Sequence, residues 1–472
     1  VLTIDAGKAL AVYGTLANGG SATGLVLSSS GSSTGMLYHT TAGVSATVER
    51  YFAAPVSWSD PAHGWHFLSS PVATQAIDPA FTNAIAENYD FYAWWEPTNQ
   101  WVNYKNSTTA PTWSTANVLG ATSGTGDFIP GKGYLAAYAA TETKSFMGVL
   151  NVSDIPVSGL TNTGSAANKG WNLLGNPFSC PISWHNAGGG WALFNIDANC
   201  QIWNETNASY SVITPGNLIP ATNGFMVHVS SPGTGSLTIP SSAMRLSPAP
   251  WYKSGESEQN RIVLKAGDAA GQTAQETIIS FDPEATEGFD PLYDSYFLAG
   301  YAPGFYSVSR NKEYALNTLP ELNGSLVIPL SFIRNNNTDF TIELIRSIPG
   351  TNVYLTDLKL NKTRNLANDP VYAFSSSPAD APGRFQLSFL LNGEGEERNQ
   401  TPAIYAWENS LYIRNQGISE LRITNLAGQI VFFDRISQSG LYQTELDLPS
   451  GYYIARLTGD AGVTVRKIRI NQ

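Results

Sequence analysis

Short apolar runs alternate with turn residues along the whole chain. Near its start, Leu2–Ile4, Ala9–Val12 and Gly24–Leu27 are apolar segments separated by Gly and Ser. Further on, Arg261–Lys265 and Glu276–Phe281 alternate polar and apolar positions, the period of two that places one face of a strand against a core. The pattern predicts an all-β protein: several β-sandwich or jelly-roll-like domains in series, with a small immunoglobulin-like sandwich at the C-terminus.

Changes in composition predict four parts. Residues 1–46 carry short strands with the spacing of a β-solenoid end or of a partial upstream domain. Residues 47–245 form a β domain with an internal repeat, and residues 246–395 follow a Pro-containing segment and form a jelly-roll-like sandwich. Residues 396–472 form the C-terminal domain. Because the chain opens at Val1 without an initiator methionine, we expect a mature or trimmed fragment.

The internal repeat is the most informative feature of the N-terminal half. Gly64–Pro71 (GWHFLSSP) resembles Gly170–Pro177 (GWNLLGNP). Each block is followed by an aromatic-rich segment and then by Ile-Pro, a Gly turn and an aromatic strand. The preserved order predicts two copies of one β unit, about residues 47–157 and 158–245, that pack face to face as a pseudo-symmetric sandwich or barrel.

Aromatic side chains of the repeated hairpins are candidate ligand-binding residues. Neighbours in a strand point to opposite faces, so one of Trp94 and Trp95 is expected to face outward, where an indole can stack on a sugar ring. The alternative is core packing, which the retention of aromatics in both copies favours. The candidate set is Trp94, Trp95, Trp101, Tyr104, Trp191 and Trp203.

Charge narrows the class of partner. The net charge is −11 and only 13% of residues are charged, which argues against nucleic acid, because its binding depends on neutralising phosphates. No apolar run reaches about 18 residues, so we expect no membrane span. Seven of the 26 Lys and Arg residues lie in residues 1–245 and nineteen lie in residues 246–472, which indicates different modules.

Residues 403–472 carry three ordered motifs. They are an Ile-x-Asn-x-x-Gly-x-x-Val block, a Leu-x-x-Gly-x-Tyr block and a basic closing strand. In this order they resemble the C-terminal sorting domain of the type IX (Por) secretion system of the Bacteroidota, and the likeness extends over most of residues 46–472. The residues that carry the sorting signal are Asn425, Gly428, Gly451, Tyr453, Arg466 and Lys467.

The resemblance implies an exported protein, at the cell surface or extracellular, that the outer-membrane secretion machinery recognises through residues 403–472. In that family the tail is commonly removed and replaced by a lipopolysaccharide anchor. It implies no single activity, because enzymes and adhesins share the tail. We expect a non-catalytic adhesin or a structural or interaction module. The alternatives are a glycan-binding module that uses the hairpin aromatics and a glycoside hydrolase or other hydrolase.

Candidate catalytic residues are few. Gly31–Gly35 matches the Gly-x-Ser-x-Gly pattern but lacks the strand before it and the helix after it, so we expect a polar turn. The five histidines show no metal-binding spacing, and none follows His228. We therefore expect no catalytic site.

A carboxylate cluster offers a second kind of chemistry. Such a cluster can bind Ca²⁺, the one cofactor considered, or supply the carboxylate pair of a glycosidase. The alternative is that these carboxylates accept backbone hydrogen bonds or pair with arginine. The cluster comprises Asp282, Glu284, Glu287, Asp290 and Asp294.

Two cysteines, Cys180 and Cys200, complete the candidates. In an exported chain they can form a disulfide that closes a short loop. The alternative is a pair of buried free thiols, and the sequence leaves both open.

Overall fold

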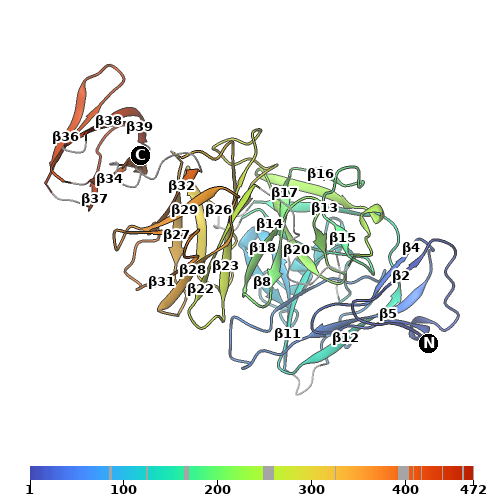
Figure 1. The fold of residues 1–472 in the computed structure, drawn as a ribbon. Coiled ribbons are helices and arrows are strands. Elements are labelled where there is room, and N and C mark those ends of the chain that lie inside the picture. Colours follow the sequence, from blue (N-terminus) through green and yellow to red (C-terminus); the bar gives the residue numbers. More distant parts are fainter. Residues whose placement is uncertain are drawn as a thin grey trace. The chain divides into compact units, whose positions relative to one another are not determined.

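The structure is a computed structural model, and strands make up nearly all of its regular structure (Figure 1). In the part of the chain that it describes, the one α-helix is the short α1 (Trp113–Ala116). The predicted all-β fold is confirmed. The described residues are 1–83, 88–123, 126–163, 169–247, 260–324, 326–391, 403–407, 409–415, 417–437, 440–459 and 462–470.

The chain divides into two compact units. The first comprises Val1–Leu322, Ile328–Ile348 and Pro370–Gly383, and the second comprises the remaining residues. The four-part division expected from the sequence stays a prediction.

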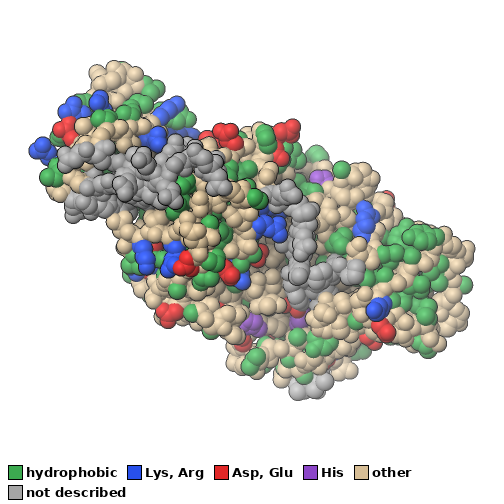
Figure 2. All heavy atoms as spheres, in the orientation of Figure 1, with side chains coloured by type: hydrophobic (Ala, Val, Ile, Leu, Met, Phe, Trp, Pro, Cys, Tyr) green, Lys and Arg blue, Asp and Glu red, His purple; other side chains and the backbone are tan. Residues whose placement is uncertain are grey.

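The N-terminal strands pair in parallel. In the first unit, β1 (Leu2–Ile4), β3 (Leu25–Leu27) and β5 (Ser45–Phe52) form successive parallel ladders, and β12 (Glu142–Val149) adds an antiparallel strand beside β5. A second parallel pair joins Ala9–Val12 (β2) to Met36–His39 (β4). Figure 2 shows hydrophobic side chains gathered over these strands, at the right of the view. Because β5 pairs with β3 and with β12, the N-terminal strands continue into the first repeat.

The two repeats have the same strand topology. The sheet of the first copy has the order β6-β11-β7-β8, and that of the second copy has the order β14-β20-β17-β18. An outer antiparallel pair accompanies each sheet, β5 with β12 in the first copy and β13 with β21 in the second. The first copy uses β6 (His66–Leu68), β7 (Tyr89–Trp95), β8 (Gln100–Asn103) and β11 (Tyr134–Tyr138). The second uses β13 (Ile155–Asn162), β14 (Trp171–Gly175), β17 (Ile196–Asn204), β18 (Ser209–Ile213), β20 (Gly224–Val229) and β21 (Gly233–Ile239).

Each copy places the tryptophan of its hairpin against the Gly-Trp block of the other. In the first copy, Trp94 Nε1 donates to the Trp171 carbonyl oxygen at 2.7 Å, and in the second, Trp203 Nε1 donates to the Trp65 carbonyl oxygen at 3.0 Å. Trp94 and Trp203 hold corresponding positions, because each precedes a hairpin turn that begins two residues later with a glutamate. A buried indole N–H needs an acceptor, and here the acceptor belongs to the partner copy.

The glutamates of the two hairpin turns also contact the opposite copy. Glu205, in the turn of the second copy, lies 3.2 Å from Arg50 Nη2 and 2.7 Å from His66 Nδ1, both residues of the first copy. Glu96, in the turn of the first copy, accepts from the Gly170 N–H at 2.8 Å and from the Thr161 hydroxyl at 2.7 Å. Burial lowers the pKa of Arg50, and the Glu205 carboxylate raises it again. The buried Glu96 and the partly buried Glu205 therefore both depend on groups of the opposite copy.

A glycine turn brings the backbones of the copies together. The Gly175 N–H donates to the Gly131 carbonyl at 2.9 Å, and the Ser69 N–H donates to the Thr222 carbonyl at 3.0 Å. A Cβ on Gly133 would lie 2.2 Å from the Leu174 carbonyl oxygen, so a side chain does not fit there.

A larger sheet, which we call the third sheet, completes the first unit. Its strands there have the order β27-β25-β26-β23-β22-β28-β31, and β24 pairs with β26. The segment around β24 fastens it to β17, because Gln201 Nε2 donates to the Ser295 hydroxyl at 2.8 Å and to the Tyr296 carbonyl at 2.7 Å. The strands are β22 (Arg261–Asp268), β23 (Ala274–Phe281), β24 (Ser295–Tyr296), β25 (Gly304–Ser309), β26 (Lys312–Leu319), β27 (Val327–Ile333), β28 (Asp339–Arg346) and β31 (Val371–Ser375).

The second unit contains the C-terminal sandwich. One of its sheets has the order β33-β34-β37 and the other has the order β36-β35-β38-β39. Leu421, Ile423, Leu457 and Ile468 belong to its buried core. The unit also holds β29 (Thr351–Asp357), β30 (Lys362–Asn365) and β32 (Phe385–Leu391). The sandwich strands are β33 (Ala403–Trp407), β34 (Ser410–Asn415), β35 (Ser419–Thr424), β36 (Ile430–Ile436), β37 (Gly440–Glu445), β38 (Gly451–Gly459) and β39 (Gly462–Ile470).

The ion pair of Glu205 with the buried Arg50 gives a stability prediction. Replacing it by alanine removes the carboxylate that faces the buried Arg50, so we expect a loss of about 3–5 kcal/mol of unfolding free energy. The matched control is Glu287→Ala, which removes the partner of Arg310 in an exposed ion pair and is expected to cost less than about 1 kcal/mol. Urea unfolding followed by tryptophan fluorescence measures both. Equal losses of unfolding free energy in the two variants would show that the Glu205–Arg50 pair between the copies contributes no more than an exposed ion pair.

Candidate functional site

Two of the six candidate aromatic residues line one pocket, and four do not. Trp101 and Trp203 line it. Trp94 lies behind the lining, its ring centroid 5.0 Å from that of Trp101. Trp95 and Tyr104 pack against the core of the first copy. The remaining candidate, Trp191, packs against the core of the second copy, and its indole N–H donates to the Ser183 carbonyl at 2.9 Å. The prediction therefore identified two residues that line a pocket and four that do not.

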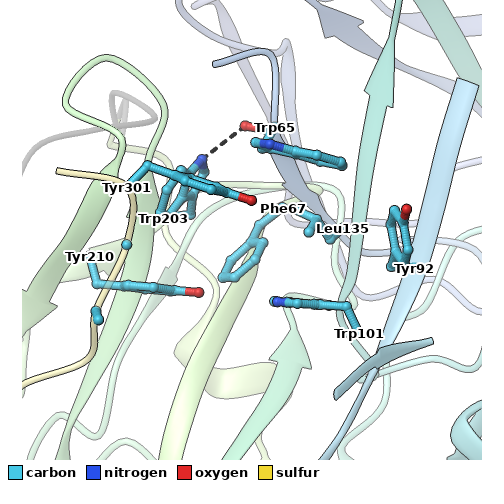
Figure 3. Close-up of a pocket in the computed structure, with 10 residues that line it drawn as sticks. Trp65, Phe67, Tyr92, Trp101, Leu135, Trp203, Tyr210 and Tyr301 are labelled. Atoms are coloured by element: carbon cyan, nitrogen blue, oxygen red, sulfur yellow. Dashed lines mark hydrogen bonds between the residues drawn. The ribbon is translucent and has the colours of Figure 1, made fainter. Parts of the chain in front are cut away.

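The pocket encloses about 330 Å³, and we call it the Trp65 pocket (Figure 3). Both repeats and the loop after β24 build it. From the first copy come β6, β7, β8 and β11, and from the second come β17 and β18. Its lining residues are Trp65, Phe67, Tyr92, Trp101, Leu135, Trp203, Tyr210, Ala299, Gly300 and Tyr301.

The rings of this pocket form two layers. In Figure 3, Trp65 and Tyr301 lie above the space, Trp101 and Tyr210 lie below it, and Phe67 stands between the layers. The Phe67 centroid is 6.0 Å from those of Trp101 and Tyr210. The hydroxyls of Tyr210 and Tyr301 and the indole nitrogen of Trp101 point inward. A flat ligand between the layers would contact ring faces and meet polar groups at its edge.

The pocket is electrically neutral. None of the ten lining side chains is Asp, Glu, Lys, Arg or His. Burial raises the pKa of Tyr210 and of Tyr301, so both phenols stay protonated at neutral pH and can donate hydrogen bonds. Phe67 and Trp203 are buried in the floor, whereas Tyr301 is 45% exposed at the mouth. The site offers apolar faces and neutral donors.

A glycine lets the distant loop reach the pocket. A Cβ on Gly300 would lie 2.5 Å from the Ala208 carbonyl oxygen and 2.9 Å from the Trp203 ring. The Tyr301 N–H donates to the same carbonyl at 2.8 Å, which fixes the phenol over the hairpin of the second copy. Sequence reasoning missed Tyr301, because nothing links residue 301 to the repeats. It also missed Trp65 and Tyr210. Trp65 lies in a repeated Gly-Trp block, which was a signal for it, whereas Tyr210 lies outside the matched blocks.

The predicted calcium cluster is not formed. Asp294 Oδ2 accepts from the Asp290 N–H and its Oδ1 from the Thr318 N–H, both at 2.7 Å. Burial raises the pKa of Asp294 to about 7, against the lowering effect of these two bonds. Asp290 itself accepts from the Thr286 N–H at 2.6 Å. These carboxylates close the loop before β24. Over the described ranges, no group of three or more His, Cys, Asp or Glu side chains is placed to hold a metal ion.

The other three carboxylates of the set are also separated. Glu284 accepts from the Tyr293 hydroxyl at 3.1 Å, and Glu287 pairs with Arg310 at 3.3 Å. Asp282 lines a different pocket of about 490 Å³ together with Arg261. Among the residues that line that pocket, Asp282 is the one carboxylate. The alternative of loop carboxylates that cap backbone groups or pair with arginine describes them.

Of the two states left open for the cysteines, the structure has the pair of buried free thiols. Cys180 and Cys200 are both free and buried in the core of the second copy. Cys200 lies inside β17, opposite Ile213 and Val227 on the neighbouring strands, and packs as a small apolar side chain. Burial raises the pKa of Cys180 to about 12, which leaves it a protonated, unreactive thiol.

The residues predicted to carry a sorting signal lie in turns and strands of the C-terminal sandwich. Gly428 adopts a positive φ of 82° in the turn between β35 and β36, and Asn425 Oδ1 caps that turn. Gly451 begins β38, and the Tyr453 hydroxyl donates to the Pro449 carbonyl at 2.8 Å. The basic residues Arg466 and Lys467 lie on the edge strand β39.

Comparisons with known proteins give limited information. A family described as a domain of unknown function (DUF8693) matches residues 191–389, from the second repeat into the third sheet. No curated protein matches the chain. A solved structure described as "Biofilm associated protein - BSP domain" is 9% identical, and the likeness covers 90% of this chain and 92% of that one. Its TM-score of 0.18 is too low to carry an argument. Within the described residues, no helix is long and apolar enough to cross a membrane.

The free cysteines give a direct chemical prediction. We expect a thiol reagent such as DTNB to leave both cysteines unmodified in the native protein and to titrate two thiols in denaturant, because both side chains are buried. The melting temperature should not change with a reducing agent. Fewer than two thiols in denaturant without reductant would show that a disulfide forms after all.

Proposed function

We propose that this chain is an exported, non-catalytic surface protein that binds a neutral saccharide in the Trp65 pocket. The observation that supports this proposal is the double layer of aromatic rings, with Trp65 and Tyr301 facing Trp101 and Tyr210. It develops the alternative of glycan binding, with a different set of aromatic residues.

A sugar ring matches this chemistry. Its C–H faces are apolar and stack on aromatic rings, while its hydroxyls lie around the rim and need hydrogen-bond partners. The pocket supplies ring faces above and below, and the phenols of Tyr210 and Tyr301 and the indole N–H of Trp101 at the edge. A volume of about 330 Å³ lies at the lower end of the range for small-ligand sites, which suits one or two sugar units.

Binding without hydrolysis fits the lining residues. Most glycoside hydrolases use a pair of carboxylates beside the scissile bond. The Trp65 pocket has no carboxylate among its lining side chains. The carboxylates of residues 282–294 accept backbone hydrogen bonds or pair with other side chains. These observations support an adhesin or a binding module over a hydrolase.

Export rests on the C-terminal sandwich. Residues 403–472 carry the motifs that resemble a type IX sorting domain, and the described part of this segment has its own buried core. The outer-membrane secretion machinery is the partner that this resemblance implies. We propose that the sandwich supplies the address, while the Trp65 pocket in the first unit supplies the binding.

The pocket is tested with two variants on a glycan array and by calorimetry with a neutral glycan from the array. Tyr301→Ala removes a half-exposed ring at the mouth, and Trp101→Ala removes a ring of the lower layer. We expect each to weaken binding about tenfold or more, because one stacked ring contributes on the order of 1–2 kcal/mol.

The matched control is Trp58→Ala, which removes an exposed tryptophan outside the pocket lining and should bind as the wild type does. Circular dichroism confirms that the variants are folded. If the folded wild-type protein binds no neutral glycan, the proposal is wrong. It is also wrong if binding survives both pocket variants.

The sorting proposal gives a separate prediction. We expect the double variant Arg466→Ala, Lys467→Ala to accumulate inside cells of a host with a type IX system, because it removes the basic charges of β39 while the core residues Ile468 and Ile470 remain. The control is Arg435→Ala, Arg456→Ala, which removes two exposed charges from other strands of the same sandwich. Surface labelling and cell fractionation locate each protein. Wild-type surface delivery after deletion of residues 463–470 would refute a sorting role.

A further inference from the structure

A second pocket surrounds Trp171, the residue that corresponds to Trp65 in the repeated Gly-Trp blocks. It encloses about 430 Å³ within the first unit, and we call it the Trp171 pocket. Sequence reasoning did not single it out. Its lining residues are Asn162, Lys169, Trp171, His228, Ser230, Pro232, Tyr296, Phe297, Asn311, Lys312 and Glu313.

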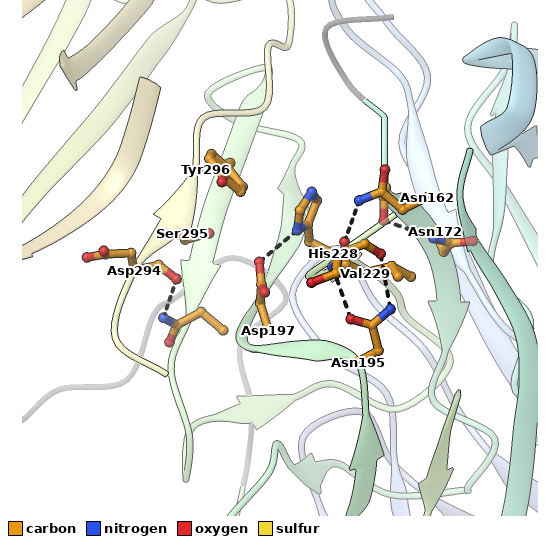
Figure 4. A network of polar contacts seen from close by, with 12 residues as sticks. Asn162, Asn172, Asn195, Asp197, His228, Val229, Asp294, Ser295 and Tyr296 are labelled. Atoms are coloured by element: carbon orange, nitrogen blue, oxygen red, sulfur yellow. Dashed lines mark hydrogen bonds and ion pairs between the residues drawn. The ribbon is translucent and has the colours of Figure 1, made fainter. Parts of the chain in front are cut away.

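A buried histidine lines this pocket, and one of its ring nitrogens is hydrogen-bonded to a carboxylate. His228 Nδ1 lies 2.7 Å from Asp197 Oδ2, and both side chains are more than nine-tenths buried (Figure 4). A carboxylate accepts, so the proton between the two groups belongs to Nδ1, and Nε2 is the ring nitrogen left for a ligand. A Cβ on Gly170 would lie 2.7 Å from Nε2, so the glycine keeps the space before this nitrogen open.

A second buried polar atom in the pocket wall lacks a partner. Asn162 donates through Nδ2 to the Val229 carbonyl at 2.8 Å, and within the described residues its Oδ1 has no hydrogen-bond partner. A buried acceptor without a donor costs stability unless something supplies one. His228 Nε2 and Asn162 Oδ1 are therefore two polar atoms of this pocket wall that can form hydrogen bonds with hydroxyl groups of a ligand.

The rim of the pocket is cationic. Lys312 donates to the Tyr296 hydroxyl at 2.9 Å and has further donors, since an ammonium carries three. Lys169, which also lines the pocket, is exposed. Glu313 also lines the pocket, but its carboxylate accepts from the Tyr306 hydroxyl at 2.9 Å. The lining therefore carries two ammonium groups and the Glu313 carboxylate, and the Asp197 carboxylate lies behind His228.

The difference between the two pockets follows from the repeat. When the Gly-aromatic turns of the two copies are aligned, Tyr134 corresponds to Phe225. Ala137 of the first copy therefore corresponds to His228 of the second. The second copy therefore keeps the Gly-Trp framework and adds an ionisable side chain where the first has a methyl group. The Trp65 pocket is neutral, and the Trp171 pocket has polar atoms inside and ammonium groups at its rim.

We propose that the Trp171 pocket is a second binding site, for a sugar unit that carries a carboxylate, a uronic acid. Its saccharide part rests on the proposed function, whereas its charge preference rests on this pocket alone. Lys312 and Lys169 pair with the carboxylate, and His228 and Asn162 form hydrogen bonds with the ring hydroxyls. The aromatic rings of Trp171 and Phe297 supply apolar contacts. The protein would then read a mixed neutral and acidic polysaccharide with two differently charged pockets.

The test is a ligand-observed NMR titration of the full chain with three probes: sodium D-glucuronate, methyl β-D-glucoside and sodium sulfate. Lys312→Gln removes the ammonium from an exposed side chain, and we expect it to weaken glucuronate binding about tenfold, the effect of losing one charge-assisted hydrogen bond. His228→Asn, which retains a donor for Asp197, should weaken glucuronate binding as well.

The matched control is Lys105→Gln, because Lys105 also lies over a tyrosine ring, that of Tyr89, but outside the pocket lining. It should leave glucuronate binding unchanged. The proposal is overturned if glucuronate does not bind, if Lys312→Gln and His228→Asn bind it as the wild type does, or if sulfate displaces it at equal concentration. Loss of glucuronate binding in Lys312→Gln with no glucoside binding anywhere would support this site and reject the Trp65 pocket as a neutral-sugar site.

Discussion

The reciprocal hydrogen bonds between the hairpins and the Gly-Trp blocks of the two repeats are the constraint on which the rest of the first unit depends. Each copy buries an indole whose acceptor is a carbonyl of the other copy, Trp171 for Trp94 and Trp65 for Trp203. Each also has a turn carboxylate, the buried Glu96 or the partly buried Glu205, whose donors belong to the other copy. A single copy would leave these polar groups unsatisfied, and the cost of burying them alone exceeds a typical side-chain contribution to stability. The two copies are therefore one folding unit.

These contacts between the two copies also determine where the pockets lie. Because the hairpin of one copy ends at the Gly-Trp block of the other, a pocket lies beside each Gly-Trp tryptophan. The segment around β24 then covers both regions, with Tyr301 at the Trp65 pocket and Tyr296 at the Trp171 pocket. One repeated framework thus yields two concave sites, and the third sheet contributes a wall to each.

The sequence predicted the all-β class, the repeated unit and two pocket tryptophans, Trp101 and Trp203. These features leave local signals, since strand alternation and matched blocks can be counted along the chain. The turn glutamates left none, because a glutamate beside a hairpin turn looks solvent-exposed until the partner copy is placed. Tyr301 was also out of reach, since its position depends on a loop packing against a distant hairpin.

The corrected predictions have a common physical cause. The carboxylates of residues 282–294 have the spacing of oxygen ligands, but Asp290 and Asp294 satisfy backbone N–H groups of their own loop. The sequence spacing of a metal site and that of a capped loop are similar, because both need short acidic side chains near a turn. In the same way, two cysteines twenty residues apart do not distinguish a disulfide from two small core side chains.

The distinction between a core aromatic and a ligand-binding aromatic lies in the second face of the ring. Trp94 and Trp101 are paired across one hairpin and touch each other, yet Trp94 is covered on its far side and Trp101 faces a pocket. Both residues fit the repeat equally well, so retention of an aromatic in each copy does not separate folding from binding. What separates the copies is the side chain that changes within a conserved framework, such as His228 in place of Ala137. We infer that the residues shared by the two copies maintain the common fold, whereas the residues that differ determine which ligand each pocket binds.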